Sequence, residues 1–503
     1  MSGAHVAYRS NDERDLDETV DWVVVGSGAG GAAAAVTLAR GGAQVGLVEA
    51  GAWRDPDDYP ESAYGAMRDL VDDWASQVTM GRAFWPVVQA RTMGGTTVIN
   101  SAICVRTPDD IFTQWEQKLG IAGLRDDVLA AEERAERELS SEEVPPEARG
   151  RSNLLAKKGA DALGWSDSHW IHRYAKDCTG AGQCFQGCKK RRKQSTNLVW
   201  VPEVLARGGL VVSCAPVERV TIHGDRAIGV VGRFVHPLTK RKGTRFRVRA
   251  RKGVIVAASV THSPMILMRS GVKKNVGAGF RSHPGTGVFG VYDEPVDQNV
   301  GATQGWASTS FREEPGLKLE TLSLPLELVA SRFAGGGVEL IRRIERYRHV
   351  AMWCHAVRAE SVGRIKPSLF GNPTVHYSLD DADMRRFRQG VVLLAKQHVA
   401  AGAKAILPGI AGLPFELAPD EIDTLEDAPL DPRRYIAILS HLFGGCMMGG
   451  DPDASVCDAS GRVHGVRGLV VADASVIPTN LGVNPQHTIM GLATVFAERA
   501  LRD

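Results

Sequence analysis

The sequence lacks a charge excess of either sign. It has 60 Lys and Arg residues against 58 Asp and Glu residues, which leaves a formal net charge of +2. A chain this close to neutral is not typical of a dedicated nucleic-acid-binding protein. No apolar run reaches the length of a membrane span, and residues 1–20 are polar and acidic, without the apolar core of a secretion signal. We therefore expect a cytoplasmic protein with no nucleic-acid partner and no membrane span.

Cysteines and aromatic residues are also few. Eight cysteines in 503 residues do not make a disulfide framework, and aromatics account for only 6% of the chain. Glycine is abundant instead, at 55 positions, and suits tight turns against ligands. The hydrophobic fraction of 44% and the charged fraction of 23% are ordinary for a globular protein and exclude wholesale disorder. The length predicts two or three domains.

The N-terminal region contains one complete βαβ unit. Residues 22–25 form a short continuous apolar run, which is typical of a strand buried on both faces. Residues 32–40 have the small-residue pattern of a helix that ends at a glycine pair, and residues 44–48 predict a second strand. A glycine-rich turn joins the first strand to the helix, so the unit has the order expected of a dinucleotide-binding site.

The turn of this unit is Gly26-x-Gly28-x-x-Gly31, and Glu49 follows the second strand. Gly26 allows a sharp turn, Gly28 lets the backbone approach a pyrophosphate, and Gly31 lets the helix pack closely on the strand. Glu49 lies where an acid can accept hydrogen bonds from the ribose of adenosine, which disfavours NADP. The ordered set predicts a dinucleotide site rather than a chance glycine-rich turn.

Two later segments are candidates for ligand contact. Gly94 and Gly95 precede small hydroxyl residues, a pattern that suits a backbone packed on a flat ring or a phosphate and, equally, an ordinary turn. His441 lies in a Gly- and Met-rich loop without apolar periodicity, and Asn484-Pro485 has the residues of a helix start. The positive end of that helix could stabilise an anionic reduced flavin.

Taken in order, these motifs resemble those of the glucose–methanol–choline (GMC) flavin oxidoreductases, from about residue 21 to residue 503. The resemblance implies an α/β fold with a Rossmann-like FAD-binding domain and a mixed-sheet substrate domain. It rests also on a looser copy of the family's second signature and on a C-terminal motif, which are Ser263-Pro264 with Ser270-Gly271 and Asp473-Ala474-Ser475.

The resemblance implies non-covalent FAD as the cofactor. Some members of the family attach the flavin through a histidine directly before the conserved asparagine. Ile99 stands at that position here, directly before Asn100. The residues that match the family's cofactor contacts are Gly26, Ser27, Gly28, Gly30, Gly31, Glu49, Ala50, Met93, Gly94, Gly95, Thr96, Asn100, Ala102, Val217, Asp473, Ala474, Asn484 and Pro485.

The resemblance also implies a reaction, the oxidation of an alcohol to an aldehyde or ketone by hydride transfer to flavin N5. His441 matches the family's catalytic histidine and would accept the hydroxyl proton, because an imidazole can act as base and then as acid. Asn484 matches its partner and would hold the alcohol oxygen without titrating. Oxygen or another electron acceptor would then reoxidise the flavin. His487 is expected to face the start of its helix rather than the substrate.

We expect four segments along the chain. A flexible N-terminal arm covers residues 1–20, and an FAD-binding domain covers 21–285 and includes a cysteine loop at 178–195. A substrate-binding domain covers 286–430. Residues 431–503 return to the FAD-binding domain and carry the catalytic residues.

Two local patterns are clear within these segments. Arg245, Arg247, Arg249 and Arg251 alternate with apolar residues, which predicts a strand whose charges guard a solvent-facing sheet edge rather than a nucleic-acid patch. Residues 384–401 have the pattern of an amphipathic helix.

Cys178, Cys184 and Cys188 lie in one loop, followed by the basic run 189–193. Three thiolates at this spacing could bind a metal or an iron–sulfur cluster, and bacterial FAD-dependent sugar dehydrogenases of this family have similar spacing. Sterol- and long-chain-alcohol-oxidising relatives also have it, and residues 193–195 resemble their Lys-x-Ser ending. Reduced structural thiols are the favoured interpretation, so we assign no metal ligand.

Residues 301–305 and 322–326 resemble segments of the long-chain-alcohol and sterol group, which favours a bulky, rather apolar alcohol as substrate. The alternative is an FAD-dependent sugar dehydrogenase that passes electrons to an external acceptor, through a cluster in the cysteine loop. Two further classes are a relative with lyase or light-driven decarboxylase chemistry and a flavin-binding structural protein. The presence of both His441 and Asn484 favours redox work.

Overall fold

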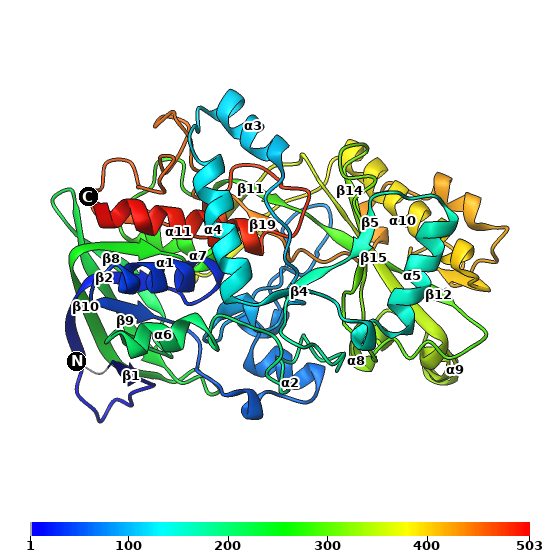
Figure 1. Ribbon diagram of the computed structural model, residues 1–503, viewed down its shortest axis with the longest axis horizontal. Helices are drawn as coiled ribbons and strands as arrows, with labels where there is room; N and C mark the ends of the chain where they lie inside the picture. Colours follow the sequence, from blue (N-terminus) through cyan, green and yellow to red (C-terminus); the bar gives the residue numbers. More distant parts are fainter. Residues whose placement is uncertain (1–2, 503) are drawn as a thin grey trace.

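The computed structural model describes residues 3–502, and each of its two halves contains a large sheet (Figure 1). Helix α11 (Gln486–Arg502), at the end of the chain, packs against α1 (Ala29–Arg40), near its beginning. The chain therefore starts and ends in the same half and crosses to the other half between. Met1, Ser2 and Asp503, which the expected segments included, lie outside the described residues.

The first sheet has the strand order β1-β7-β3-β2-β10-β9-β8, with β20 also pairing with β10. Strands β1, β7, β3, β2, β10 and β20 pair in parallel, whereas β8 and β9 add an antiparallel meander. This is the predicted Rossmann-like architecture. The strands are β1 (Ala4–Val6), β2 (Leu16–Val25), β3 (Val45–Val48), β7 (Leu210–Val212), β8 (Val217–His223), β9 (Arg226–Val235), β10 (Lys242–Val256) and β20 (Leu469–Val471).

Helices cover this sheet and bury its central strands. Residues 22–25 of β2 and all four residues of β3 are buried, as expected of parallel strands covered on both faces. Alanines at positions 32–35 are fully buried in α1, and their small side chains allow close packing. The helices of this half, besides α1 and α11, are α2 (Ala63–Asp69), α3 (Asp109–Leu119), α4 (Arg125–Glu138), α6 (Trp200–Ala206) and α7 (Ser259–Arg269).

The N-terminal segment differs from the predicted arm. Strand β1 pairs with β7, and β2 begins at Leu16 rather than at residue 21. The first residues of β2 pair with Phe246 and the positions after it in β10, about 230 residues away in the sequence. Because the partner strand is so distant, the polar composition of this segment hid its pairing. The prediction of a flexible arm is therefore wrong for residues 4–6 and 16–20.

The second half contains a six-stranded antiparallel sheet of order β18-β12-β15-β14-β13-β5 and a smaller sheet of order β17-β16-β11-β19. A two-stranded ribbon of β4 and β6 completes the strands. Their bounds are β4 (Ser141–Glu143), β5 (Ser168–Trp170), β6 (His172–Tyr174), β11 (Ala278–Ser282), β12 (Gly285–Val291), β13 (Trp306–Ser308), β14 (Leu317–Thr321), β15 (Val350–Val357), β16 (Gly363–Pro367), β17 (Pro373–His376), β18 (Ala405–Leu407) and β19 (Leu442–Phe443).

The helices of the second half show where the expected segments need correction. They are α5 (Gly150–Ala162), α8 (Leu326–Ala330), α9 (Gly337–Glu345) and α10 (Asp381–Ala401). Helix α5 packs against α10, and β5 pairs with β13. Residues 150–170 therefore belong with the substrate half and not with the FAD-binding half. Helix α10 begins three residues before the predicted start, where the Asp380 carboxylate accepts a hydrogen bond from the Asp383 N–H (2.8 Å).

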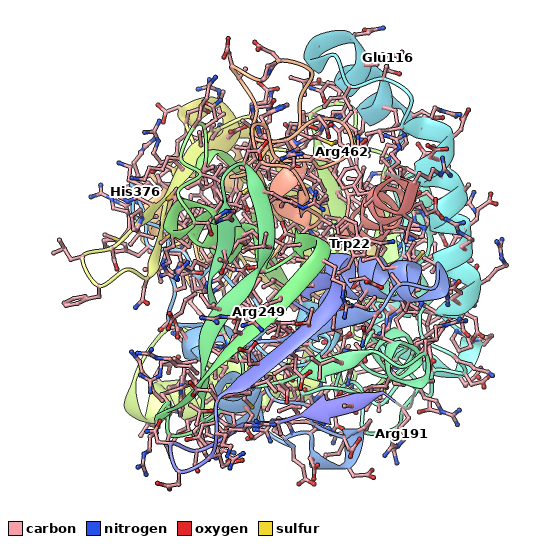
Figure 2. All side chains as sticks on the ribbon, turned by 90° about the vertical axis from the view of Figure 1, so that its left-hand side faces the viewer. Trp22, Glu116, Arg191, Arg249, His376 and Arg462 are labelled. Atoms are coloured by element: carbon pink, nitrogen blue, oxygen red, sulfur yellow. The ribbon has the colours of Figure 1, made fainter. Side chains whose placement is uncertain are left out.

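The arginines of β10 lie on the open face of the first sheet. Strand β10 pairs with β2 on one side and β9 on the other, so it is an interior strand and not a sheet edge as expected. Figure 2 shows Arg249 beside β2, where its guanidinium pairs with the Asp17 carboxylate (2.9 Å). The charges balance the neighbouring strand instead of guarding an edge.

Candidate active site

A cavity of about 520 Å³ lies between the carboxyl ends of β2 and β3 and the second half of the chain. Its volume falls within the range of small-molecule sites, roughly 300–1,000 Å³. Ser27, Gly31, Met93, Gly94 and Ala102 do not line it. The other predicted cofactor and catalytic residues do, and they are Gly26, Gly28, Gly30, Glu49, Ala50, Gly95, Thr96, Asn100, Val217, His441, Asp473, Ala474, Asn484 and Pro485.

The glycines of the first turn have two different roles. Gly26 has φ of +94°, and an added Cβ at Gly26, Gly30 or Gly31 would collide with a main-chain oxygen. These three glycines are needed for the turn and for packing. At Gly28, which precedes α1, the nearest protein atom to an added Cβ is the Cα of Gly95, at 3.9 Å. Gly28 thus leaves open space for a ligand rather than for the protein.

Glu49 is held by the same turn. Its carboxylate accepts hydrogen bonds from the N–H (2.9 Å) and hydroxyl (2.7 Å) of Ser27 and from the N–H of Gly51 (2.7 Å). Burial raises the pKa of Glu49, and these hydrogen bonds oppose that shift. The Ser27 hydroxyl also accepts from the N–H of Gly94 (2.8 Å). Ser27 and Gly94 therefore position the cavity wall without lining it.

The second glycine-rich segment forms the wall opposite this turn. Gly94 and Gly95 both have positive φ, +93° and +53°, and an added Cβ at Gly95 would lie 2.8 Å from the Cα of Gly28. The Asn100 side chain donates to Gln486 at the start of α11 and accepts from the N–H of Ala102 (2.9 Å). The segment is thereby tied both to the first turn and to the C-terminal helix.

The C-terminal motif closes the cavity. The Asp473 carboxylate is buried and accepts hydrogen bonds from the N–H of Ser259 (2.9 Å), the hydroxyl of Ser263 (2.5 Å) and the N–H of Ser475 (2.8 Å). These contacts join the C-terminal strand region to α7. Pro485 stands directly before α11, whose N-terminus faces the cavity.

These features fit FAD. The cavity runs from a glycine turn at a helix N-terminus, suited to a pyrophosphate, to a histidine and an asparagine 43 positions apart in sequence. Gly28 has room that the protein itself does not use. Glu49 lies beside that turn, where it can accept hydrogen bonds from a ribose.

His441 lies at the far end of the cavity, directly before β19. Its main-chain oxygen accepts from the N–H of His283 (2.9 Å), and the two imidazoles lie 5.3 Å apart with their Nδ1 atoms at 3.2 Å. Its Nε2 lies 3.3 Å from the amide nitrogen of Asn484. The pairing of β19 with β11 therefore holds His441 between a second histidine and the predicted partner asparagine.

A buried ion pair lies behind Asn484. Lys318 on β14 is 2% exposed, and its ammonium lies 2.5 Å from the carboxylate of Glu320 and donates to the Asn484 carbonyl oxygen. The other carboxylate oxygen of Glu320 accepts from the Gln304 amide (3.0 Å). The ammonium has only donors, so it fixes the amide of Asn484 with its NH₂ group toward His441.

This contact sets the direction of a chain of hydrogen bonds. Because Asn484 presents its NH₂ group, Nε2 of His441 is the acceptor, and Nδ1 of His441 therefore carries the proton. That N–H donates to Nδ1 of His283. The order Lys318, Asn484, His441, His283 thus leaves Nε2 of His441 without a proton, in the form that can accept one.

The charge state of His441 agrees with this role. Burial lowers the pKa of His441 to about 4, with Glu320 opposing the shift and Lys318 adding to it. Burial also lowers the pKa of His283 well below its ordinary value. Both imidazoles are therefore neutral near pH 7, and His441 can accept a proton from a bound hydroxyl.

Lys318, Glu320 and His283 were not found by sequence reasoning. The alternation Lys318-x-Glu320 in a strand places both side chains on one face, which is the only signal the sequence offers. Nothing in the sequence states that this face is turned toward the active site. When a strand from a distant part of the chain packs beside a catalytic motif, that contact can be identified only from the folded structure.

His487 does not line the cavity. It is fully buried, and its ring contacts the Tyr174 hydroxyl and the Glu136 carboxylate (3.1 Å). Burial alone lowers the pKa of His487, but contacts with Cys104 and Glu136 outweigh burial and raise it to about 9. His487 therefore forms part of a buried charged network between α4 and the first turn of α11.

The cysteine loop is organised around a guanidinium. The two amino groups of Arg173 donate to Cys178 Sγ (3.7 Å) and to Cys184 Sγ (3.0 Å). The cavity that the three thiols line is about 30 Å³, space on the order of one or two water molecules. A buried guanidinium and so small a space give the iron–sulfur alternative no support.

Within residues 3–502, no helix is both long and apolar enough to cross a membrane.

Comparison with known proteins identifies the family of the chain. The N-terminal GMC oxidoreductase profile matches residues 21–285, and the C-terminal profile matches residues 359–493. An uncharacterised GMC-type oxidoreductase of Sinorhizobium fredii is 32% identical, over 98% of this chain and 96% of its own. A long-chain-alcohol oxidase of Arabidopsis thaliana is 26% identical, over 95% of this chain and 66% of its own.

The fold has solved counterparts. A formate oxidase of Aspergillus oryzae superposes with a TM-score of 0.72 over 97% of this chain and 99% of its own, at 18% sequence identity. At that identity, the likeness concerns the fold. It agrees with the arrangement of a parallel-stranded cofactor half and a second, antiparallel half.

Proposed function

The chain belongs to the GMC oxidoreductase family and is an FAD enzyme that acts on CH–OH groups, and from that premise we propose its reaction. It oxidises a bulky, largely apolar alcohol to an aldehyde or ketone, with His441 as the base and Asn484 positioning the alcohol oxygen. The observation that carries the proposal is the hydrogen-bond chain that leaves Nε2 of His441 unprotonated, as an acceptor, beside Asn484.

FAD, when bound, supplies the acceptor for a hydride from the alcohol carbon. Gly28 would leave room for its pyrophosphate, and Glu49 would accept hydrogen bonds from its ribose hydroxyls. Asn100, tied to Gln486, fixes the wall of the cavity next to the C-terminal helix. We propose that binding is non-covalent, because Ile99, which lines the cavity, has no group that could form a bond to the cofactor.

His441 and Asn484 act together on the alcohol oxygen. The hydroxyl donates its proton to Nε2 of His441, and the Asn484 NH₂ group donates to the oxygen. The two nitrogens now lie 3.3 Å apart, so the alcohol oxygen would replace the direct hydrogen bond between Asn484 and His441. His283 accepts from Nδ1–H and stabilises the imidazolium that forms, because its own ring is neutral.

One part of the cavity wall is apolar. Leu322, Leu324 and Pro325, from the segment after β14, line it together with Ile103 and Phe185. These side chains offer no hydrogen bonds to the many hydroxyls of a sugar, and they favour a long or bulky hydrocarbon group. The long-chain-alcohol oxidase of Arabidopsis thaliana supports the same substrate class.

The test is anaerobic reduction of the bound flavin by a panel of alcohols. We expect long-chain primary alcohols or sterols to bleach the flavin band near ~450 nm, whereas glucose does not. His441→Ala is expected to retain FAD and to lose kcat by about 10²–10⁴-fold. His376→Ala, outside the cavity, serves as the matched control (Figure 2). Bleaching by glucose alone, or a His441→Ala variant with normal kcat, contradicts the proposal.

Oxygen and artificial electron acceptors are then compared as reoxidants. We propose oxygen or an external acceptor as the second substrate, and the faster of the two reoxidation rates identifies an oxidase or a dehydrogenase. The sugar dehydrogenase alternative predicts iron in the purified protein in addition to FAD, which an iron assay tests directly.

A further inference from the structure

Three thiols line a small cavity beside the proposed FAD site. Cys178, Cys184 and Cys188 surround a space of about 30 Å³, and Cys184 also lines the large cavity. All three cysteines are partly exposed. None of them has a part in the reaction proposed above. Cys184 therefore lies between the small cavity and the cofactor cavity.

Two buried cations face these thiols. Arg173 is 2% exposed and Lys193 is 3% exposed. Neither forms a salt bridge with a carboxylate within the part of the chain that the structure describes: Arg173 donates to the carbonyl oxygen of Ser101 (2.7 Å) and to two sulfurs. A buried guanidinium without an anion is costly, so the sulfurs are its natural counter-charge.

The loop is folded so that two of the thiols meet one guanidinium. Gly180 and Gly182, both with φ of +68°, reverse the chain between Cys178 and Cys184. Ala181 between them bridges to Gly301. As a result Cys178 and Cys184 accept from the two amino groups of Arg173.

Cys188 has a different partner. Its sulfur accepts a hydrogen bond from the main-chain N–H of Lys193 (3.5 Å). The Lys193 ammonium donates to the carbonyl oxygens of Val98, Asn100 (2.8 Å) and Cys184 (2.9 Å). Lys193 thus ties the Cys184 main chain to the wall of the cofactor cavity.

The electrostatics of Cys184 follow from these neighbours. Burial raises the pKa of the Cys184 thiol, but Arg173 and Lys193 outweigh burial and lower it to about 7. Burial lowers the pKa of Lys193 to about 8.

The other charged side chains that line the small cavity are Lys189, Lys190 and Arg192, and Arg192 is paired at 3.8 Å with Asp177. Arg191 of the same basic run points outward (Figure 2) and pairs with Asp57 (3.0 Å).

We propose that Cys184 and Cys178 form a peroxide-sensitive thiol pair, in which Cys184 is the reacting sulfur and Cys178 resolves it. The oxidant is hydrogen peroxide, because a space of about 30 Å³ admits so small and uncharged a molecule and excludes a peptide disulfide. The proposal does not depend on which alcohol the enzyme oxidises.

The chemistry balances in two steps. The Cys184 thiolate attacks one peroxide oxygen, the O–O bond breaks, hydroxide leaves, and Cys184 becomes a sulfenic acid. The sulfur loses two electrons and the peroxide gains them. The Cys178 thiol then attacks the Cys184 sulfur, an S–S bond forms, and the sulfenic oxygen leaves as water with the thiol proton. A thiol reductant converts the Cys178–Cys184 disulfide back to two thiols.

The reaction also has a consequence for the cofactor cavity. Because Lys193 joins the carbonyl oxygen of Cys184 to those of Val98 and Asn100, any displacement of Cys184 on forming the S–S bond moves that wall. We expect the absorbance or fluorescence of bound FAD to change on oxidation and to recover on reduction.

Peptide mapping tests the proposal on the FAD-loaded enzyme. Trypsin cleaves after Lys176 and Lys189, which leaves all three thiols in one peptide, and chymotrypsin cleaves after Phe185 and separates Cys188. After hydrogen peroxide treatment, blocking of free thiols and both digestions, we expect the 177–185 peptide to lack two hydrogens. A reduced 177–185 peptide at doses that oxidise an ordinary thiol, or an S–S bond to Cys188, overturns the proposal.

Variants separate the two roles. Cys178→Ser is expected to abolish the S–S bond and to leave Cys184 as a sulfenic acid that a cyclic 1,3-dione traps. Cys188→Ser is the matched control and keeps the S–S bond. Arg173→Met is expected to slow oxidation at pH 7 by ~10-fold or more, because fewer Cys184 groups are thiolates, whereas Arg173→Lys keeps most of the rate. If Arg173→Met does not fold, Cys178→Ser alone decides: a variant in which no dione adduct forms at Cys184 overturns the proposal.

Discussion

The replacement of Lys318 by methionine tests the hydrogen-bond chain directly. The side chain removed carries the ammonium that donates to Asn484 and pairs with Glu320 (2.5 Å). Without that donor, the Asn484 amide is no longer held with its NH₂ group toward His441. A hydrogen bond from a charged group contributes about 1.5–3 kcal/mol. We therefore expect kcat/KM for the alcohol to fall by ~10–100-fold at pH 8.

The same replacement moves the acid limb of the pH profile. Lys318 lowers the pKa of His441 and Glu320 raises it, so removing the ammonium leaves only the carboxylate. The Lys318 ammonium is joined to His441 through the Asn484 amide. For two unit charges about 7 Å apart at an effective dielectric constant near 20, Coulomb's law gives about 2 kcal/mol, or ~1.5 pKa units. His441 must be unprotonated to act as base. The pH below which kcat/KM falls should therefore rise from about 4 toward a value above 5.

The assay is kcat/KM from about pH 3 to 9 on the wild-type enzyme, Lys318→Met and Lys318→Met/Glu320→Gln. The double variant has no local charge, so its acid limb is expected near that of the wild type while its rate at pH 8 stays low. This separates the effect of charge from the effect of amide orientation. A Lys318→Met enzyme with the wild-type acid limb and the wild-type rate refutes the reasoning.

Other predictions concern the first glycine turn, the buried network of His487 and the apolar part of the cavity wall at Leu324. Gly28→Ala is expected to keep the melting temperature of the apoprotein and to lose FAD affinity, whereas Gly31→Ala, whose Cβ would collide with the Gly26 oxygen, is expected to lower the melting temperature; FAD titration and thermal unfolding distinguish them. Because the pKa of His487 is raised from 6.5 to about 9, its protonation contributes about 3 kcal/mol below pH 6.5, and this is lost as pH rises through 9. A His487→Gln variant should therefore show a flatter curve of unfolding free energy against pH, and an unchanged slope counts against the network. Leu324→Ser is expected to raise KM for a long-chain alcohol by ~30-fold with little change for a short one, since about 2 kcal/mol of apolar burial is removed; equal effects on both alcohols would argue that Leu324 does not contact the chain.

The cofactor half could be predicted because its signals are local. The glycine spacing of the first turn and the continuous apolar run of β2 can both be recognised within residues 22–31. His441 and Asn484 were found through their resemblance to a family pattern and not through spacing, and the structure brings them to 3.3 Å. Local chemistry and family pattern together identified fourteen of the residues that line the cavity.

The remaining parts depend on partners that are distant in sequence. Residues 16–20 are polar and alternate weakly, and only their pairing with β10 makes them a strand. Helix α5 lies in sequence among residues of the cofactor half, yet its apolar side packs on α10 of the other half. Lys318 and Glu320 belong to β14, whose orientation is set by the antiparallel sheet around it. No window of the sequence contains this information.

The buried Lys318–Glu320 pair contributes little or nothing to the stability of the fold, and its role is to orient Asn484 for the reaction. Replacing a buried ion pair by residues of similar volume is often neutral or stabilising by 1–4 kcal/mol, whereas removing one partner costs about 3–5 kcal/mol. Lys318→Met alone should therefore lower the melting temperature, and Lys318→Met/Glu320→Gln should recover most of the loss. The double variant would then be stable and still slow, because no apolar side chain can fix the amide of Asn484. If the double variant were as unstable as the single one, the pair would be part of the core's stability and its orienting role would lose this support.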